Sequence, residues 1–270
     1  MGLLIRDAVA ADYATFARLF PELETGDPIP DEARFTSELM ATTIIAEEGG
    51  AALGVLVYVV LTGVAHVRII VVDPSARRRG IGRALMREAA ERFRAAKCAA
   101  WCLNTFPHNA KAIALYESLG LRRVYISKAL RLPWSIVDAR RASGGSAGFR
   151  ARPVEPADDE RVEAATSLLP GQLADGRANG RVLRQLEDDT GAVVGAAIFD
   201  PKFPGAYPFR VVRPELAWPL LAALRPDARP EDTIVNLVIE GQPEVADELL
   251  ASGATLRLET QHMRGPLAAA

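Results

Sequence analysis

The order of hydrophobic and polar positions along the first half of the chain predicts a mixed α/β layout. Apolar residues recur every four positions over 81–95, which is typical of one buried face of a helix. The largely apolar stretch at 65–72 and the uninterrupted apolar run at 99–103 predict buried strands. The full predicted order is strand 3–6, helices 10–19 and 34–40, strands 43–47, 52–62 and 65–72, helix 81–95, strand 99–103, helix 109–118 and strand 122–132.

Four short patterns of the first half recur in the same order in the second half. We therefore predict two copies of one α/β fold, the second copy being shortened. The matched patterns are Leu3-x-x-Arg6…Asp12 with Phe149-x-x-Arg152…Asp158, Glu47-Glu48-x-Gly50 with Asp188-Asp189-x-Gly191, Val71-Val72-Asp73-Pro74 with Val211-Val212-Arg213-Pro214, and, loosely, Glu117-Ser118-Leu119-Gly120 with Leu250-Ala251-Ser252-Gly253.

A Gly- and Ser-rich stretch at 139–148 marks the boundary between the copies. We place the first domain at 1–136, a linker at 137–148 and the second domain at 149–270. Each copy has one strand fewer than expected at its C-terminal end. Exchange of strands between the halves, or between chains, is therefore a hypothesis.

Composition narrows the class of protein. The chain has 270 residues, 49% of them hydrophobic and 24% charged, with a net charge of -2, so nothing favours nucleic acid as a partner. No apolar run is long enough to span a membrane, and the N-terminus does not have the pattern of a signal peptide. We expect a cytoplasmic protein; its oligomeric state is left open, a homodimer included. Cys98 and Cys102 are expected to be core thiols, and no metal site is expected.

The segment after the strand at 65–72 carries the strongest chemical signal. Gly80 and Gly82 stand at the start of the next helix, where free backbone N–H groups and the helix dipole favour an anion. Four positive side chains surround them, and a diphosphate is the natural ligand. Neither a third glycine nor a Gly-Lys-Ser/Thr sequence follows, so the dinucleotide and Walker patterns do not fit. The four side chains are Arg77, Arg78, Arg79 and Arg83.

This segment, Arg77-x-x-Gly80-x-Gly82 after Val72-Asp73-Pro74, resembles the acetyl-CoA signature of the GCN5-related N-acetyltransferase (GNAT) superfamily. The later stretch 109–121, with Asn109, Ala112, Tyr116 and Gly120, resembles the second motif of that family. The resemblance covers about 3–132. The whole chain resembles bacterial tandem acetyltransferases, and the ending 261–265 is similar to that of the YitH-like group.

The resemblance implies direct transfer of an acetyl group from acetyl-CoA to the amine of a small molecule or a peptide. Pantetheine would lie between the strands at 65–72 and 99–103, and backbone N–H near Val72 would stabilise the oxyanion. Tyr116 would be the general acid, because a phenol can protonate a thiolate leaving group. The residues assigned to acetyl-CoA are Ile70, Val71, Val72, Arg77, Arg78, Arg79, Gly80, Ile81, Gly82, Arg83, Ala84, Asn104, Asn109, Ala112 and Tyr116.

The general base and the acceptor are not identified by the sequence. Asn104 stands where protein N-terminal acetyltransferases of the family have Glu, and water is an alternative to any side chain. An acidic segment could attract a cationic amine or be a solvated loop. An acetyl-CoA-binding regulator without turnover and transfer to another acceptor stay as alternatives. The candidate bases are Asp73, His66, Glu47 and His108, and the acidic residues are Glu22, Glu24, Asp27, Asp31 and Glu32.

The second copy has lost the features that carry this chemistry. The arginine and glycine loop is missing after Val212-Arg213-Pro214, and Pro219 removes a backbone donor near the start of the next helix. Gln242 and Leu249 stand at the positions of Asn109 and Tyr116. We therefore predict that the second domain is degenerate and non-catalytic.

Overall fold

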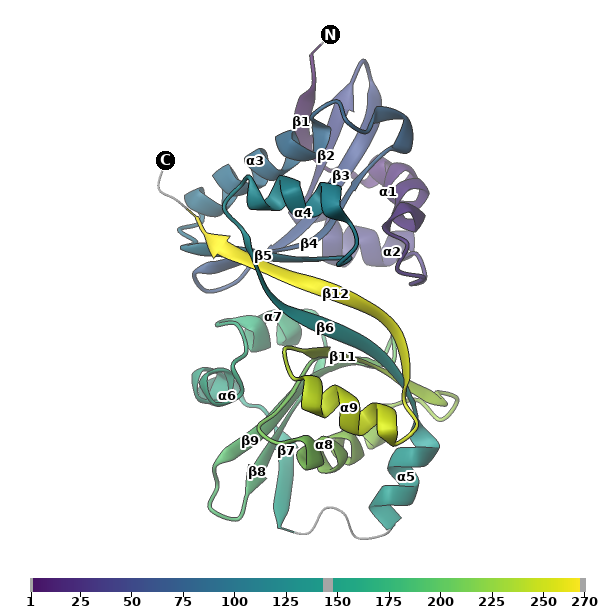
Figure 1. Cartoon of the computed structure of the whole chain (residues 1–270), viewed down its shortest axis with the longest axis vertical. Helices are drawn as coiled ribbons and strands as arrows, with labels where there is room; N and C mark the ends of the chain where they lie inside the picture. The colour runs from purple at the N-terminus through teal and green to yellow at the C-terminus, as the bar shows by residue number, and fades with distance from the viewer. Residues whose placement is uncertain (1, 143–147, 268–270) are drawn as a thin grey trace. The chain divides into compact units, whose positions relative to one another are not determined.

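The computed structural model describes residues 2–142 and 148–267, in which twelve strands follow the order β1-β2-β3-β4-β5-β12-β6-β11-β10-β9-β8-β7 in a mixed sheet (Figure 1). The chain divides into two compact units. The first unit contains 1–105, 109–123 and 263–270, and the second contains 106–108 and 124–262. The predicted mixed α/β class is confirmed.

The elements of the first half agree closely with the predicted order. Helix 34–40 is an exception, since α2 is a short turn continued by a wider π-type turn at Phe35–Leu39. The elements are β1 (Leu4–Asp7), α1 (Tyr13–Leu19), η2 (Phe20–Leu23), α2 (Glu32–Arg34), β2 (Thr43–Glu48), β3 (Ala51–Val60), β4 (Val64–Val72), α3 (Ile81–Ala95), β5 (Ala100–Thr105), α4 (Ala110–Glu117) and β6 (Arg122–Pro133).

The second half repeats this order. Its elements are α5 (Trp134–Ala142), β7 (Phe149–Pro153), α6 (Asp159–Thr166), α7 (Gln172–Ala178), β8 (Val182–Asp188), β9 (Val193–Asp200), β10 (Gly205–Val211), η7 (Pro214–Leu216), α8 (Ala217–Leu224), β11 (Ile234–Glu240), α9 (Pro243–Ala251) and β12 (Thr255–Pro266).

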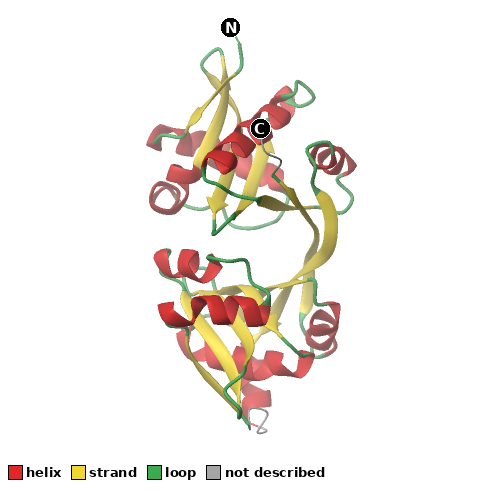
Figure 2. Ribbon diagram, turned by 90° about the vertical axis from the view of Figure 1, so that its left-hand side faces the viewer, coloured by secondary structure: helices red, strands yellow, loops and turns green. Residues whose placement is uncertain are grey.

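Helices cover both faces of the strands in the first unit (Figure 2). On one face, α3 buries Leu85, Ala89 and Phe93 in a core shared with β4 and β5. On the other face, Phe16 of α1 and Phe35 pack against β2 and β3. The four-residue spacing that predicted α3 therefore corresponds to its buried face.

The expected linker is helical in its first part. Residues 137–142 belong to α5, which buries Trp134 and Val137 against the core of the second unit. These residues of the expected linker are therefore part of a helix. The next part of the stretch, 143–147, lies outside the described residues.

Each unit contains residues from the last strand of the other copy. Strand β6 pairs antiparallel with β11, from Ser127 opposite Glu240 to Pro133 opposite Ile234. The end of β12 belongs to the first unit, where Met263 joins the core and the Leu267 N–H donates to the Ala99 carbonyl at 2.9 Å. Figure 1 shows β6 and β12 side by side. The hypothesis of strand exchange is thus confirmed within one chain, and the units are not contiguous segments of sequence.

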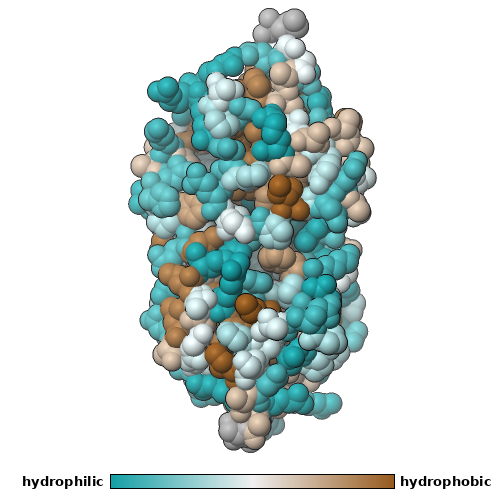
Figure 3. Space-filling model, turned by 90° about the vertical axis from the view of Figure 1, so that its right-hand side faces the viewer, coloured by the Kyte–Doolittle hydropathy of each residue, from teal (hydrophilic) through white to brown (hydrophobic). Residues whose placement is uncertain are grey.

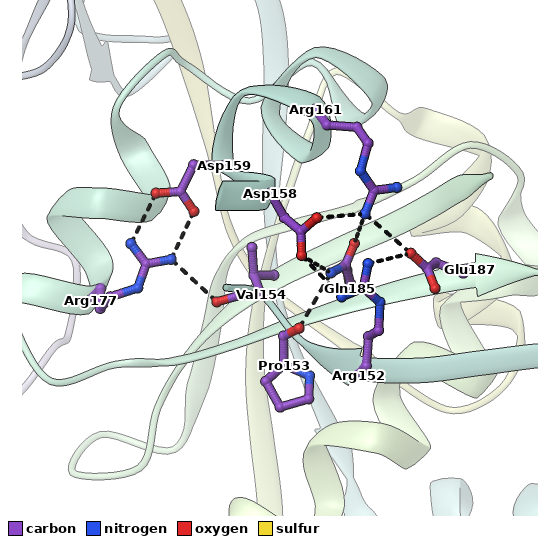
Figure 4. Close-up of polar contacts among 9 residues, drawn as sticks. All are labelled: Arg152, Pro153, Val154, Asp158, Asp159, Arg161, Arg177, Gln185 and Glu187. Atoms are coloured by element: carbon purple, nitrogen blue, oxygen red, sulfur yellow. Dashed lines mark hydrogen bonds and ion pairs between the residues drawn. The ribbon is translucent and has the colours of Figure 1, made fainter. Parts of the chain in front are cut away.

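One ion-pair arrangement occurs in both units and supports the internal repeat. Arg6 donates to Asp12 at 2.7 Å and to Glu47 at 2.7 Å, and it lowers the pKa of the Asp12 carboxyl. In the second unit, Arg152 donates to an aspartate and a glutamate in the same way (Figure 4).

The partners of Arg152 are Asp158 at 3.0 Å and Glu187 at 2.8 Å, so Glu187 is the counterpart of Glu47. The match of Glu47 with Asp188 was therefore wrong by one residue. Strand register corrects the third pattern too, because Gly54 pairs with Val72 where Gly195 pairs with Val211. The turns differ in length between the copies, which shifts the alignment.

Among the described residues, no helix is long and apolar enough to cross a membrane. The face drawn in Figure 3 is mostly polar, with apolar residues in small groups.

The exchange predicts that a residue near the C-terminus controls the stability of the first unit. A Cβ at Gly265 would lie 2.4 Å from the Gly120 carbonyl oxygen and 2.9 Å from Leu121 Cα. Gly265→Ala should therefore lower the free energy of unfolding by roughly 1–3 kcal/mol or more, measured by urea denaturation. Arg264→Ala changes an exposed neighbour and should cost no more than about 0.5 kcal/mol. Equal stability of the two variants would contradict the packing of β12 on the first unit.

Candidate active site

Strands β4 and β5 separate at the centre of the first unit. They pair in parallel over only four positions, from Val64 opposite Ala100 to Val67 opposite Leu103. Strand β4 continues to Val72 with β3 on one side only, where Gly54 pairs with Val72. The other edge of its last five residues has no strand partner in the described chain. An unpaired strand edge presents N–H and C=O groups to which an extended ligand can bind.

A β-bulge lies at the point of separation. Val57 is opposite Ile69 and Tyr58 is opposite Val67, so Arg68 is the extra residue of β4. A bulge bends its strand and strengthens the local twist. It therefore explains why β4 leaves β5 directly after Val67.

The chain leaves β4 through a loop that prepares an anion site at α3. Gly80 is the N-cap at φ +83°, and Arg78 is also in the left-handed region at φ +66°. The first helical hydrogen bond runs from the Ala84 N–H to the Gly80 carbonyl at 3.0 Å. The N–H groups of Ile81, Gly82 and Arg83 therefore have no helical acceptor, and the Gly80 N-cap provides no side chain. Free N–H groups and the helix dipole favour an anion here.

Gly82 lies where three elements meet. A Cβ at this position would be 3.6 Å from Leu115 of α4 and 3.8 Å from Val72 of β4. The structure thus brings the end of β4, the first turn of α3 and the middle of α4 close together.

The four arginines of the loop differ in their partners. Arg77 donates from Nε to the Val72 carbonyl at 3.1 Å and from Nη2 to Glu22 at 2.7 Å. Arg79 pairs with Glu48. Arg78 and Arg83 are exposed and form no ion pair with a described residue. Two of the four cations are therefore free for a ligand.

Three further predicted residues lie on the second side of the gap. Asn109 is the N-cap of α4, and its Oδ1 accepts from the Ala112 N–H at 3.2 Å. The carboxamide NH2 group of Asn109 is exposed and can donate to a ligand. Asn104 is near the end of β5, after its last pair with β4, and Ala112 is half-buried.

Tyr116 is buried in the core that includes α3 and α4, with 5% of its surface exposed. Burial raises the pKa of its phenol to about 12. The hydroxyl forms no hydrogen bond with a described residue, and it stays protonated at neutral pH. It is therefore a donor rather than a base.

The candidate bases are mostly engaged. Hydrogen bonds from Ser75 and Arg18 lower the pKa of Asp73 to about 2, so this carboxylate is a very weak base. Glu47 is paired with Arg6. His66 is buried in β4, and His108 is exposed and stacks on Phe106. The surroundings of these four side chains do not single out any of them as the general base.

The second unit keeps the bulge and the separation but closes the gap with its own side chains. Strand β10 has an extra residue between Ala206 and Phe209, and it pairs with β11 only at Gly205 and Ala206. Beyond that point Arg210 donates to the carbonyl and, at 3.1 Å, to the carboxylate of Glu240. Burial raises the pKa of the Glu240 carboxyl.

A second bridge in this unit involves the counterpart of Asn109. Gln242 is the N-cap of α9, and its side-chain amide donates to the Val211 carbonyl. The connection from β10 to α8 has five residues, whereas β4 and α3 are joined by eight. Leu249 is fully buried in the hydrophobic core.

Sequence reasoning missed the groups that surround the loop. Glu48 and Arg18 are far from it in sequence, and only the fold brings them to Arg79 and Asp73. The bulge at Arg68 gave no signal, because neither glycine nor proline marks it. Leu115, which contacts Gly82, could have been inferred from its place one residue before Tyr116.

Comparison with known proteins relates the chain to acetyltransferases. Residues 10–121 match the profile of the acetyltransferase (GNAT) family. A GCN5-related N-acetyltransferase from Sphaerobacter thermophilus is similar over 99% of this chain and 96% of its own, with 17% identity and a TM-score of 0.68. A tandem GNAT protein from the clavulanic acid biosynthesis pathway is similar over 100% of both chains, with 19% identity and a TM-score of 0.59. No curated protein matches the chain.

These likenesses show a tandem GNAT fold over the whole length of the chain. The match to the GNAT acetyltransferase family covers residues 10–121, which is less than half of the chain. The protein is an acyltransferase of the N-acetyltransferase class, for which the GNAT family implies acetyl-CoA as co-substrate and an amine as acceptor.

The high pKa of Tyr116 has a measurable consequence at alkaline pH. The fold favours the neutral phenol, so stability should fall as the pH rises from about 10, the value in the unfolded chain, to about 12 in the folded one. Tyr116→Phe should remove this part of the loss, which is roughly 2–3 kcal/mol at pH 12. Urea denaturation of both proteins between pH 9 and 12 measures it. Parallel stability curves would show that Tyr116 titrates normally.

Proposed function

We propose that the first unit transfers an acetyl group directly from acetyl-CoA to the amine of a small molecule or a peptide. The observation that carries this proposal is the unpaired edge of β4 leading to the uncapped N-terminus of α3. Such an edge fits an amide-bearing arm, and the helix start fits a diphosphate. The strand edge leads directly to the start of the helix, so the two features lie along one path. The pantetheine arm and the diphosphate of coenzyme A are joined in the same way.

The residues along this path can hold each part of acetyl-CoA. Backbone groups of Ile70, Val71 and Val72 would bond the pantetheine amides. The N–H groups of 78–83 and the side chains of Arg78 and Arg83 would bind the pyrophosphate, whereas the Ala84 N–H already donates to the Gly80 carbonyl. Asn109 would donate from its free NH2 group, and Ala112 is small enough to lie against a thin ligand.

Transfer requires a neutral amine to attack the thioester carbonyl and the thiolate to leave. Backbone N–H near Val72 would stabilise the oxyanion. Full proton transfer from a phenol of pKa about 12 to a thiolate of pKa about 8.5 is uphill by roughly 5 kcal/mol. We therefore assign Tyr116 the role of hydrogen-bond donor to the leaving sulfur, which departs as a thiolate while the phenol keeps its proton and the attacking amine releases its own proton to water. Proximity of the two substrates supplies much of the rate.

The second unit has a different role in this proposal. Arg210 and Gln242 bridge the gap that would hold pantetheine, and the connection before α8 is too short for the arginine loop. We infer that it is non-catalytic and binds no acetyl-CoA. The division into domains 1–136 and 149–270 and the similarity to the YitH-like group stay predictions from the sequence.

Two arginines on α3 provide a matched test of the anion site. Arg83 is in the first turn, and Arg87 is one turn further along; both are exposed and unpaired among the described residues. Arg83→Gln should weaken acetyl-CoA binding roughly 10-fold or more, because a charge-assisted hydrogen bond to phosphate is lost. Arg87→Gln should change it little. Calorimetric titration should also give one site per chain; two sites, or equal effects of the two variants, would contradict the assignment.

The role of Tyr116 predicts a defect in turnover rather than in binding. Tyr116→Phe should reduce kcat roughly 100-fold or more, with acetyl-CoA affinity unchanged, because the donor acts on the leaving group. Release of free thiol with a panel of amines measures this. If the unchanged protein binds acetyl-CoA but releases no thiol with any amine, the alternative of a binding regulator is favoured. Unchanged kcat in the variant would exclude Tyr116 as the donor.

A further inference from the structure

Two arginines of the loop before α3 are held by carboxylates from distant elements. Arg77 donates from Nη2 to Glu22 of η2 at 2.7 Å, and Arg79 pairs with Glu48 of the β2–β3 turn. Arg77 and Glu22 are both substantially exposed, with 48% and 37% of their side-chain surface accessible. The pair is therefore open to solvent, and a dissolved anion can reach it.

We propose that Glu22 stands in for a phosphate on Arg77 and that the pyrophosphate of acetyl-CoA replaces it on binding. This inference rests on the proposed function, because it assumes that the pyrophosphate binds at the start of α3. Carboxylate and phosphate oxygens accept the same hydrogen bonds from a guanidinium group, and the diphosphate carries more charge. An exposed ion pair contributes little to stability, so the exchange has a small cost.

A second ion pair keeps helix α1 attached to the loop during the exchange. Arg18 of α1 pairs with Asp73 and donates to the Ala52 carbonyl at 3.3 Å. Hydrogen bonds from Ser75 and Arg18 keep the pKa of Asp73 near 2, so this anchor stays ionised at any ordinary pH. Helix α1 is thus held to the loop while Glu22, beyond its C-terminal end, is released.

Release of Glu22 has a consequence for the acceptor. Before the exchange its charge is neutralised by Arg77; afterwards the carboxylate is free to pair with a cation. The binding of acetyl-CoA thereby creates an anionic position in the segment that carries Glu24 and Asp27. The acceptor class that this position fits is a molecule with a positive charge besides the reacting amine.

Two other roles for Glu22 predict different results. If Glu22 merely adds to the negative field around the site, any nearby carboxylate should matter equally. If Glu22 orients Arg77 toward the pyrophosphate, its loss should weaken binding. Only the exchange predicts that loss of the Glu22 carboxylate tightens CoA binding and that this effect requires Arg77.

The test is a double-mutant cycle on CoA affinity, measured calorimetrically with the full-length chain. Glu22→Gln should tighten CoA binding about two- to five-fold, which is the range expected for loss of a competing exposed ion pair. In the Arg77→Gln background the same change should have no effect. Glu24→Gln is the matched control, since Glu24 is exposed in the same segment and has no ion pair with a described residue. Pantetheine lacks the pyrophosphate, so its affinity should not respond to Glu22→Gln.

The outcomes separate this inference from the proposed function. Three results would overturn the exchange while leaving the site intact. Glu22→Gln and Glu24→Gln could have equal effects, the effect of Glu22→Gln could persist without Arg77, or Glu22→Gln could weaken CoA binding. Failure of the unchanged chain to bind CoA would overturn the proposed function itself.

Discussion

The separation of β4 from β5 is the constraint on which the site depends. A parallel pair normally continues as far as both strands run, and each further residue adds a ladder hydrogen bond. Here pairing stops after Val67 because the extra residue Arg68 turns β4 aside. The lost pairing leaves an edge of backbone that has no strand partner in the described chain, directly before a helix whose first N–H groups have no helical acceptor. Bulge, open edge and helix start together form one continuous polar path.

The exchanged strands keep this polar path in position. Strand β5 has β4 on one side over only four positions, so its position depends on the strand on its other side. That strand is the end of β12, and together with Leu267 it comes from the last part of the chain. The Leu267 hydrogen bond to Ala99 and the close approach of Gly265 to Gly120 fix it in place. Cofactor geometry in the first unit therefore depends on sequence that belongs to the second copy.

The sequence predicted the parts of the fold whose signals are local. Helix α3 follows from its buried four-residue spacing, and the loop follows from Gly80, whose φ of +83° few other residues adopt. Helix α5 was missed because only Trp134 and Val137 of it are fully buried, while its C-terminal half is polar and leads into glycine and serine. The repeat was recognised, but its register was wrong by one residue where turns differ in length.

The ion pairs of the site could not be predicted, because each joins positions far apart in sequence. Arg77 and Glu22 are separated by 55 positions, and Arg79 and Glu48 by 31. An arginine run alone suggests four free cations, whereas the fold leaves only Arg78 and Arg83 without an ion pair in the described chain. The number of arginines in the loop sequence therefore overstates the positive charge that is available to a ligand.

The two units show how few changes separate an open gap from a closed one. Val72 and Val211 occupy the same register position, opposite Gly54 and Gly195. The Val72 carbonyl accepts from Arg77, a flexible and exposed side chain that a ligand can displace, whereas the Val211 carbonyl accepts from Gln242, which caps the neighbouring helix. Arg210 adds a second bridge to Glu240, which is 6% exposed, so removal of either partner would leave a buried group unpaired. Closure of the second gap is thus held by the cost of unpairing its own polar groups, and the first gap stays available because its bridging groups face solvent.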